Sequence, residues 1–237
     1  MKKLKNTKIL ALLLFSVMAI SAVNPVFALN YIQDDTTVNS EYDREDAIAY
    51  ANNYYYFPNG DYRDYSSDGG DCTNFVSQCL AAGGMTMRGS QTAISARLAS
   101  SWFYYGPNVP NRSTSWTGAE NFRKHWANDS DDEGNNRAWM YRLFQYGYAA
   151  EHWLTTTAGV VRGGDPIQLV YTDGEAYHTM FALQFLINPM TGDDDIYYAQ
   201  HSDNKKAYLS DLFEILQQQY GNSVDTAISI GLIRVSQ

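Results

Sequence analysis

Cysteine is scarce in this chain. Only Cys72 and Cys79 occur among 237 residues, and both lie in the segment "GGDCTNFVSQCLAAGG" at residues 69–84. A chain of this length can bury an apolar core without disulfide bonds. With only two cysteines, a small fold held together by several disulfides is excluded. If the segment is one helix, the two Cα atoms lie about 10 Å apart. A disulfide spans at most about 7 Å, so the two cysteines cannot be bonded within that helix.

Basic residues are also few, with 17 Lys and Arg against 26 Asp and Glu. Four of the lysines fall within the first eight residues, so the rest of the chain is more acidic still. No basic stripe is present to neutralise phosphates, which excludes a nucleic-acid-binding protein. The same deficit argues against binding to anionic lipid surfaces. The sequence shows neither an internal repeat nor a low-complexity tract.

The N-terminus has the pattern of a secretory signal peptide. The basic start "MKKLKNTK" precedes the apolar run "ILALLLFSVMAISAV", and Val26 and Ala28 suit cleavage after Ala28. A single membrane anchor is the alternative, but the run is short of the roughly 20 residues that a span needs. We therefore expect a signal peptide at residues 1–28, a flexible polar leader at 29–41 and a folded domain at 42–237. The mature protein is expected to be secreted, either extracellular or associated with the cell wall, without stable insertion in the membrane after signal cleavage.

The order of predicted elements indicates an α+β fold. Helical periodicity and end signals predict helices at residues 42–57 and 72–82, and further helices at 117–128, 137–148 and 210–221. Apolar runs between turn residues predict strands at residues 165–171, 176–187, 195–201 and 227–235. Helices thus come first and an antiparallel sheet second, which is typical of α+β proteins. The proposed caps are Asp43 and Asp71, a capping box of Thr117 with Glu120, and Ser210.

The two cysteines have different predicted roles. Cys79 shares an apolar helix face with Phe75 and Leu80 and is predicted to be a buried core residue. Cys72 lies at the helix start, where the positive end of the helix dipole favours a thiolate and its own N–H can bind an oxyanion. Asp71 opposes this effect, because a neighbouring carboxylate raises the pKa of a thiol. A nucleophilic Cys72 therefore predicts a histidine partner.

Among the four histidines, His178 is the candidate base because it opens an apolar strand directly after a turn. His125 is interpreted as solvated, and His152 is assigned no catalytic role. On the next strand, Gln200 or His201 could hold the second ring nitrogen of His178 and fix its tautomer. A metal site formed by Cys72, His178 and His201 is a disfavoured alternative, since the ligand spacing is poor.

Five segments in order resemble the amidase domain family of secreted proteins from Gram-positive bacteria. They begin with "YDREDAIAYANNYYYFPNGDYRDYSSDGGDCTNFVSQCLAAGG", then "SWTGAENF", "GDPIQLVY", "AYHTMFALQF" and "YYAQHSDNKKAYLSDL". The resemblance covers residues 41–235. The family is similar to the papain-like hydrolases of the NlpC and CHAP types. It implies a papain-like fold, with the Cys72 helix packed on the C-terminal antiparallel sheet.

The resemblance implies a cysteine amidase or peptidase that acts on cell-wall peptide or a related amide, without a cofactor. Cys72 would be the nucleophile and His178 the base. The long hairpin after His178 departs from the relatives and leaves Gln200, His201 and Asp203 as candidates for the third residue, of which we favour His201. A non-catalytic wall-binding module and a cysteine acyl transferase are the alternatives. We expect a monomer.

Two further segments were considered for binding. The acidic run "NDSDDEGNN" imitates the start of a calcium loop, but its twelfth position is Met140 where a bidentate Glu is needed, so we interpret it as a solvated loop. The aromatic-rich segment at residues 102–116 is predicted to line the substrate groove.

Overall fold

The structure is a computed structural model that describes residues 31–127, 137–152 and 160–237. Its helices are α1 (Arg44–Tyr54), α2 (Cys72–Ala82), α3 (Thr114–Thr117), α4 (Ala119–Trp126), α5 (Tyr146–Glu151), α6 (Leu209–Tyr220) and α7 (Val224–Ala227). Its strands are β1 (Tyr31–Ile32), β2 (Met140–Gln145), β3 (Pro166–Tyr171), β4 (Ala176–Ile187), β5 (Asp194–Gln200), β6 (Lys205–Tyr208) and β7 (Ile228–Arg234). In this part of the chain no helix has both the length and the apolar character needed to cross a membrane.

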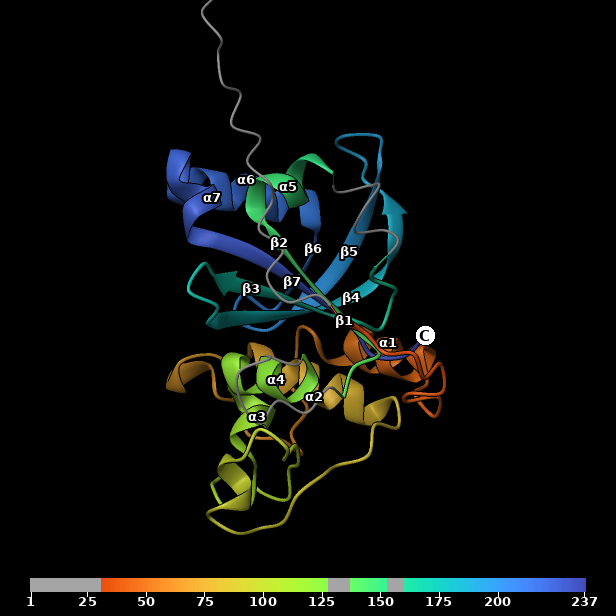
Figure 1. Cartoon of the computed structure of the whole chain (residues 1–237), viewed down its shortest axis with the longest axis vertical. Coiled ribbons are helices and arrows are strands. Elements are labelled where there is room, and N and C mark those ends of the chain that lie inside the picture. The colour runs from red at the N-terminus through yellow and green to blue at the C-terminus, as the bar shows by residue number, and fades with distance from the viewer. Residues whose placement is uncertain (1–30, 128–136, 153–159) are drawn as a thin grey trace, which may run out of the picture.

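The strands form one antiparallel sheet in the order β1-β2-β7-β3-β4-β5-β6. Figure 1 shows helices α1 to α4 gathered on one side of this sheet and α5 to α7 on the other. The mixed α+β class is therefore confirmed. The sheet is not exclusively C-terminal, because β1 and β2 precede the predicted strands, and it carries helices on both faces.

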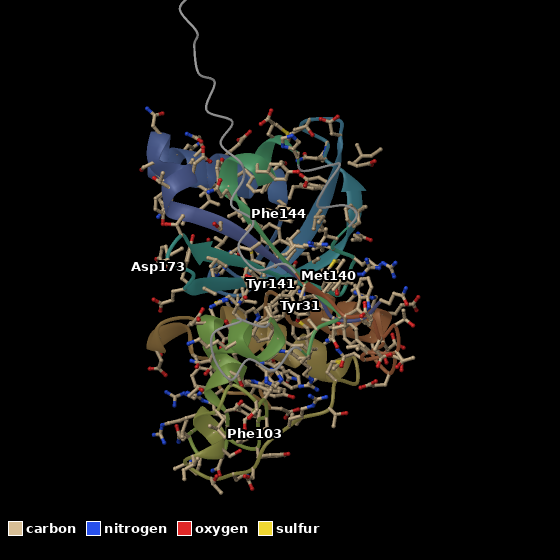
Figure 2. The ribbon with its side chains drawn as sticks, in the orientation of Figure 1. Tyr31, Phe103, Met140, Tyr141, Phe144 and Asp173 are labelled. Atoms are coloured by element: carbon tan, nitrogen blue, oxygen red, sulfur yellow. The ribbon has the colours of Figure 1, made fainter. Side chains whose placement is uncertain are left out.

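Each face of the sheet has its own apolar core. The first core joins α1 to α4 to the sheet and contains Phe75, Cys79 and Leu80 of α2. The second lies under α5 to α7 and contains Phe213 of α6. Strand β2 supplies both cores, since Tyr141 belongs to the first and Phe144 to the second (Figure 2). A sheet covered on both faces hides the simple alternation of polar and apolar residues that marks a half-exposed strand.

Helices α1 and α2 begin and end largely as predicted. Asp43 caps α1 by accepting hydrogen bonds from the backbone N–H groups of Glu45 and Asp46. Helix α2 ends at Ala82, directly before Gly83 and Gly84. A Cβ atom at Gly83 would lie 2.5 Å from the ring of Tyr42 and 2.6 Å from the carbonyl oxygen of Asp43, so only glycine permits this close approach between the helices.

The predicted helix at residues 137–148 is wrong. Met140–Gln145 is strand β2, paired along its whole length with β7, and α5 begins only at Tyr146. Two predicted caps are also wrong. Gly118, not Thr117, stands at the N-cap of α4, and α6 begins one residue before Ser210, whose hydroxyl donates to Asp195 instead.

The described part of the predicted leader is attached to the domain. Tyr31 and Ile32 pair with Tyr141 and Met140 of β2. Asn39 is buried, and its amide donates to the carbonyl oxygens of residues 137 and 235, each at 2.7 Å. The polar composition of this segment gave no sign that it would pair with the sheet.

Candidate active site

The first turn of α2 presents Cys72 at the edge of the first core. Cys72 is the first residue of the helix, and 8% of its surface is exposed. Asp71 occupies the N-cap position, but its side chain makes no capping hydrogen bond. Among the described contacts none occupies the N–H group of Cys72, so the helix start keeps a free donor beside the thiol.

The structure places the side chains of Cys72 and His178 in contact with each other. Burial raises the pKa of the Cys72 thiol, but the hydrogen bond and charge of His178, together with the backbone N–H of Thr179, lower it, and the resulting pKa is about 7. Burial lowers the pKa of His178, whereas its hydrogen bonds to Cys72 and Gln200 raise it, with a net increase. Each partner thus favours the charged form of the other.

Gln200, not His201, holds the ring of His178. The Nε2 atom of His178 lies 2.8 Å from Oε1 of Gln200. Because an amide oxygen only accepts, Nε2 carries the proton, and Nδ1 is left as the basic nitrogen of the ring. The structure thus places Gln200, and not the favoured His201, beside the candidate base. Asp203, the other alternative, lies on the surface and accepts from Lys205 at 3.2 Å.

Strand geometry explains why Gln200 reaches His178. Ala199 faces the first core and Tyr198 the second, so Gln200 points away from α2 and His201 toward it. The pairing of β3 with β4 steps from Leu169–His178 to Val170–Ala176 and passes over Tyr177, which makes a β-bulge beside the candidate base. Bulges redirect side chains next to functional sites.

His201 lies on the opposite side, against α2. Its ring stacks on Phe75 with centroids 4.2 Å apart, and Nδ1 lies 2.6 Å from Oδ2 of Asp71. Its Nε2 donates to the backbone oxygen of Tyr54 at 2.8 Å. The carboxylate of Asp71, which we expected to raise the pKa of Cys72, thus contacts His201 instead. Asp71 is not among the groups that shift the pKa of Cys72.

The remaining predictions for cysteine and histidine are settled by burial. Cys79 is fully buried in the first core, and burial raises its pKa well above the ordinary value, as a core residue requires. The prediction that His125 is solvated is wrong, because this residue is fully buried on α4. Burial and the charge of Arg137 lower the pKa of His125 to about 3. His152 stacks on Tyr148 at 4.3 Å.

A chain of buried polar side chains beneath Cys72 was missed by sequence reasoning. The hydroxyls of Thr73 and Thr179 lie 3.0 Å apart, and the amide of Gln168 donates to Thr179 at 3.0 Å. These contacts tie α2 to β3 and β4 directly below the pair of Cys72 and His178. The sequence did contain a sign of these contacts, because each of these apolar segments includes one of the polar residues. A buried polar side chain needs a hydrogen-bond partner.

Most large side chains of the aromatic segment at residues 102–116, which we predicted to line the substrate groove, lie in the interior, whereas Tyr105 is exposed. Trp102, Phe103 and Trp116 are fully buried, and the indole N–H of Trp116 donates to Asn74 of α2 at 2.9 Å. The acidic run interpreted as a solvated loop lies mainly at residues 128–136, outside the described residues.

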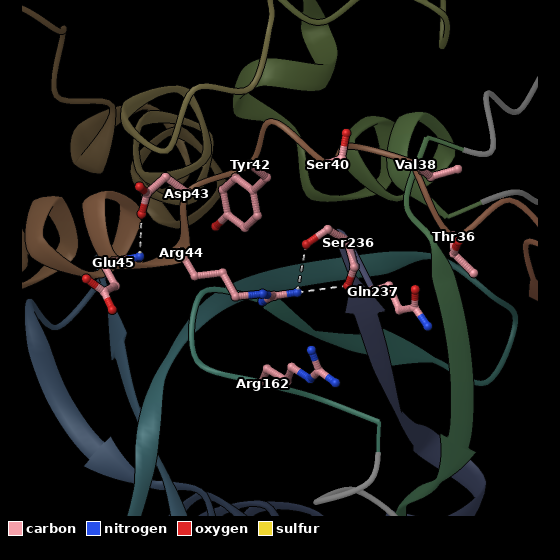
Figure 3. Close-up of a pocket in the computed structure, with 10 residues that line it drawn as sticks. All are labelled: Thr36, Val38, Ser40, Tyr42, Asp43, Arg44, Glu45, Arg162, Ser236 and Gln237. Carbon is pink, nitrogen blue, oxygen red and sulfur yellow. Dashed lines mark hydrogen bonds between the residues drawn. The ribbon is translucent and has the colours of Figure 1, made fainter.

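Asp165, in the segment "GDPIQLVY", forms a buried ion pair with Arg44 that we call the clamp. Asp165 is fully buried and accepts from Arg44 of α1 at 2.7 Å, while Arg44 also donates to the backbone oxygens of Gly163 and Ser236. Arg44 borders a cavity of about 750 Å³ that contains none of the predicted catalytic residues (Figure 3). Its lining is Thr36, Val38, Ser40, Tyr42, Asp43, Arg44, Glu45, Arg162, Ser236 and Gln237.

Over residues 31–127, 137–152 and 160–237, no group of three or more His, Cys, Asp and Glu side chains is arranged to hold a metal ion. The disfavoured metal site would have used His201, whose two ring nitrogens are engaged by Asp71 and Tyr54.

Comparison with known proteins assigns the family. The model of the family described as "Putative amidase domain" matches residues 41–224. The chain belongs to this family. Over 90 residues it is also 37% identical to the uncharacterized protein YhbB of Bacillus subtilis (strain 168), an alignment that covers 37% of this chain and 25% of that protein. The chain thus aligns with about a quarter of this curated relative. No solved structure matches this amidase-family chain significantly.

Proposed function

We propose that this member of the amidase family is a secreted, papain-like cysteine amidohydrolase of the NlpC and CHAP type that cleaves amide bonds of cell-wall peptide. The observation that carries the cysteine mechanism is the placement of Cys72 at the start of α2 against His178, with the pKa of the thiol lowered to about 7. A thiolate at neutral pH is the form that attacks carbonyl carbon. The signal-like residues 1–28 and the resemblance of the DCTNFVSQ segment to wall hydrolases support secretion and a wall substrate.

In the proposed reaction, Nδ1 of His178 takes the proton of Cys72, and Sγ attacks the carbonyl carbon of the scissile amide. The N–H of Cys72 donates to the oxyanion that forms. His178 then gives its proton to the leaving amine as the C–N bond breaks, which leaves a thioester on Sγ. Water attacks this thioester, loses a proton to His178 and releases the acid, and Cys72 regains its proton. Gln200 keeps the imidazole in the tautomer that this cycle needs.

The test compares the mature protein with Cys72→Ala and Cys79→Ala on purified Gram-positive cell wall. New amino groups and the masses of released fragments are measured. We expect wild type and Cys79→Ala to release amines and Cys72→Ala to release none, because only Cys72 faces His178. Release by Cys72→Ala would overturn the cysteine mechanism.

The same experiment separates the alternatives. Wild-type protein that sediments with the wall but releases no amine would instead indicate a binding module. Products that carry an added amine in place of water would indicate acyl transfer on the same residues. An active enzyme that cleaves small peptide amides but leaves wall untouched would overturn only the substrate assignment.

A further inference from the structure

His201 has a chemical environment that no catalytic contact explains. It follows β5 directly after Gln200, and 1% of its surface is exposed. It touches neither Cys72 nor His178 by any described hydrogen bond. Its ring is instead held between the face of Phe75, the carboxylate of Asp71 and the end of α1.

Both ring nitrogens of His201 face groups that accept hydrogen bonds. Nε2 lies 2.8 Å from the carbonyl oxygen of Tyr54, which cannot donate. Nδ1 lies 2.6 Å from Oδ2 of Asp71, a carboxylate whose other oxygen already accepts from the backbone N–H of Tyr65 at 3.0 Å and the amide of Asn74 at 2.8 Å. Two donors on that oxygen favour the ionised form of the carboxyl group, which leaves Oδ2 as an acceptor. Satisfying both acceptors then requires a proton on each nitrogen of the ring.

His125 provides the contrasting case in the same molecule. It is as deeply buried as His201, and its Nδ1 lies 2.7 Å from the carbonyl oxygen of Ala99. Its Nε2, however, lies 3.0 Å from the guanidinium of Arg137, which only donates. His125 must therefore be neutral with its single proton on Nδ1, in agreement with its lowered pKa.

We propose that His201 is a buried imidazolium that acts as a positioning residue for the reaction. Through Asp71 it fixes the residue that precedes the nucleophile, and through its own backbone it fixes Gln200, which orients the base. It also neutralises a carboxylate that would otherwise disfavour a thiolate in the next residue. Asp71 and, farther away, Asp64 are the acidic groups that interact with it. The kinetic part of this proposal rests on the proposed function, and the charge state does not.

The charge state is tested on the unaltered mature protein by NMR of ¹⁵N-histidine at neutral pH. We expect one-bond couplings to protons on both ring nitrogens of His201, and on Nδ1 alone for His125. Assignments come from His201→Gln and His125→Gln spectra. A bare Nδ1 on His201 would overturn the proposal, because the proton would then belong to Asp71.

The positioning role is tested by the rate at which iodoacetamide alkylates Cys72 at neutral pH, a readout that needs no substrate. We expect His201→Gln to lower this rate and kcat by about 10²-fold with little change in KM, since small displacements of reacting groups have this cost. His125→Gln is the matched buried control and should lose stability without this loss of thiol reactivity. An unchanged rate in folded His201→Gln would overturn the role. If His201→Gln lowers the alkylation rate of Cys72 as expected but the wild-type protein has no amidase activity, the proposed function is overturned. The role of His201 in positioning Cys72 would then still stand.

Discussion

At the scale of single residues, the two cysteines lie in opposite electrostatic environments. His178 and the N–H of Thr179 bring the pKa of Cys72 to about 7, whereas burial raises that of Cys79. Because a lowered pKa means that the thiolate forms above about pH 7 and is lost below it, alkylation of Cys72 by iodoacetamide should rise with a midpoint near pH 7. Peptide mapping should find Cys79 unmodified in the folded protein.

The control for this pH profile is His178→Ala. Removing the imidazole removes the hydrogen bond and charge that lower the pKa of Cys72 most and leaves the effect of burial and the N–H of Thr179, so the midpoint should move to higher pH. Cys79→Ala should keep the wild-type midpoint. Equal modification of both cysteines at every pH would contradict the environments described for them.

Gln200 is the second residue with a testable role. Gln200→Ala removes the acceptor of the Nε2 proton of His178, so the ring can rotate or change tautomer. We expect kcat on wall peptide to fall by about 10–100-fold while the stability changes little, since a small misplacement of a catalytic group has costs of this size. Asp203→Ala is the matched control three residues away and should retain wild-type kcat. Equal losses in both variants would contradict the assignment.

The choice between Gln200 and His201 could not be made from the sequence alone. In a strand, residues separated by an even number share a face, so Ala199 and His201 lie together and Gln200 lies opposite. The apolar Ala199 suggests the side that faces α2. What the sequence does not contain is the register of β4 with β3 and the bulge at Tyr177, which decide where His178 points. These depend on pairing between distant segments and not on local pattern.

At the scale of elements, the clamp between Arg44 and Asp165 holds α1 against the ends of β3 and β7. Asp165 is fully buried and also accepts from the backbone N–H groups of Arg162 and Val235. Arg44→Ala leaves this carboxylate buried without its cation, which should lower the free energy of unfolding by about 3–5 kcal/mol. Urea denaturation followed by circular dichroism measures the loss.

The control for the clamp is Lys205→Ala, which breaks the exposed pair with Asp203. Exposed pairs contribute only about 0–1 kcal/mol, so this variant should be close to wild type. The double variant Arg44→Ala with Asp165→Asn should recover part of the loss, because it removes the uncompensated charge. Similar stabilities for Arg44→Ala and Lys205→Ala would contradict a buried clamp.

Element type was predicted well for α2 and for four of the strands, although β7 is buried along its whole length, and wrongly for β2. Helix α2 and strands β3, β4, β5 and β7 lie within two residues of their predicted bounds. Strand β2 was read as a helix because it supplies both cores, and Tyr141, Leu143 and Phe144 give no period of two. The caps at Thr117 and Ser210 failed because Glu120 and Ser210 have tertiary partners, the backbone of Ala176 and the carboxylate of Asp195.

At the scale of the whole molecule, the sheet separates two cores, and the candidate site lies where α2 meets the sheet. Cys72 comes from α2, whereas His178 and Gln200 come from β4 and the end of β5. Composition and the order of elements predicted the α+β class but not this arrangement. The helices after β6 were predicted only in part, and the sequence does not state which face of a sheet they cover.

The segment before α1 allows a test of how far the folded unit extends. The family match begins at residue 41, yet the hydroxyl of Tyr31 donates to the backbone of Trp126, and Asn39 donates to the backbone oxygens of Arg137 and Val235. Each such hydrogen bond contributes about 1 kcal/mol, and removal of Asn39 leaves its two carbonyl acceptors without this donor. For a domain of this size each kcal/mol shifts Tm by about 2–4 °C.

A chain that starts at Tyr42 should therefore melt on the order of 10 °C below one that starts at Leu29, as measured by calorimetry on both proteins. Asn39→Gly in the longer chain isolates the buried amide, because glycine accepts the positive φ of 52° at this position. It should lower Tm by several degrees, whereas Thr37→Ala, at an exposed turn, should leave Tm unchanged. Equal melting of the two chain lengths would show that residues 29–41 are a dispensable leader, because the strand β1 and the buried Asn39 would then contribute nothing to the stability of the domain.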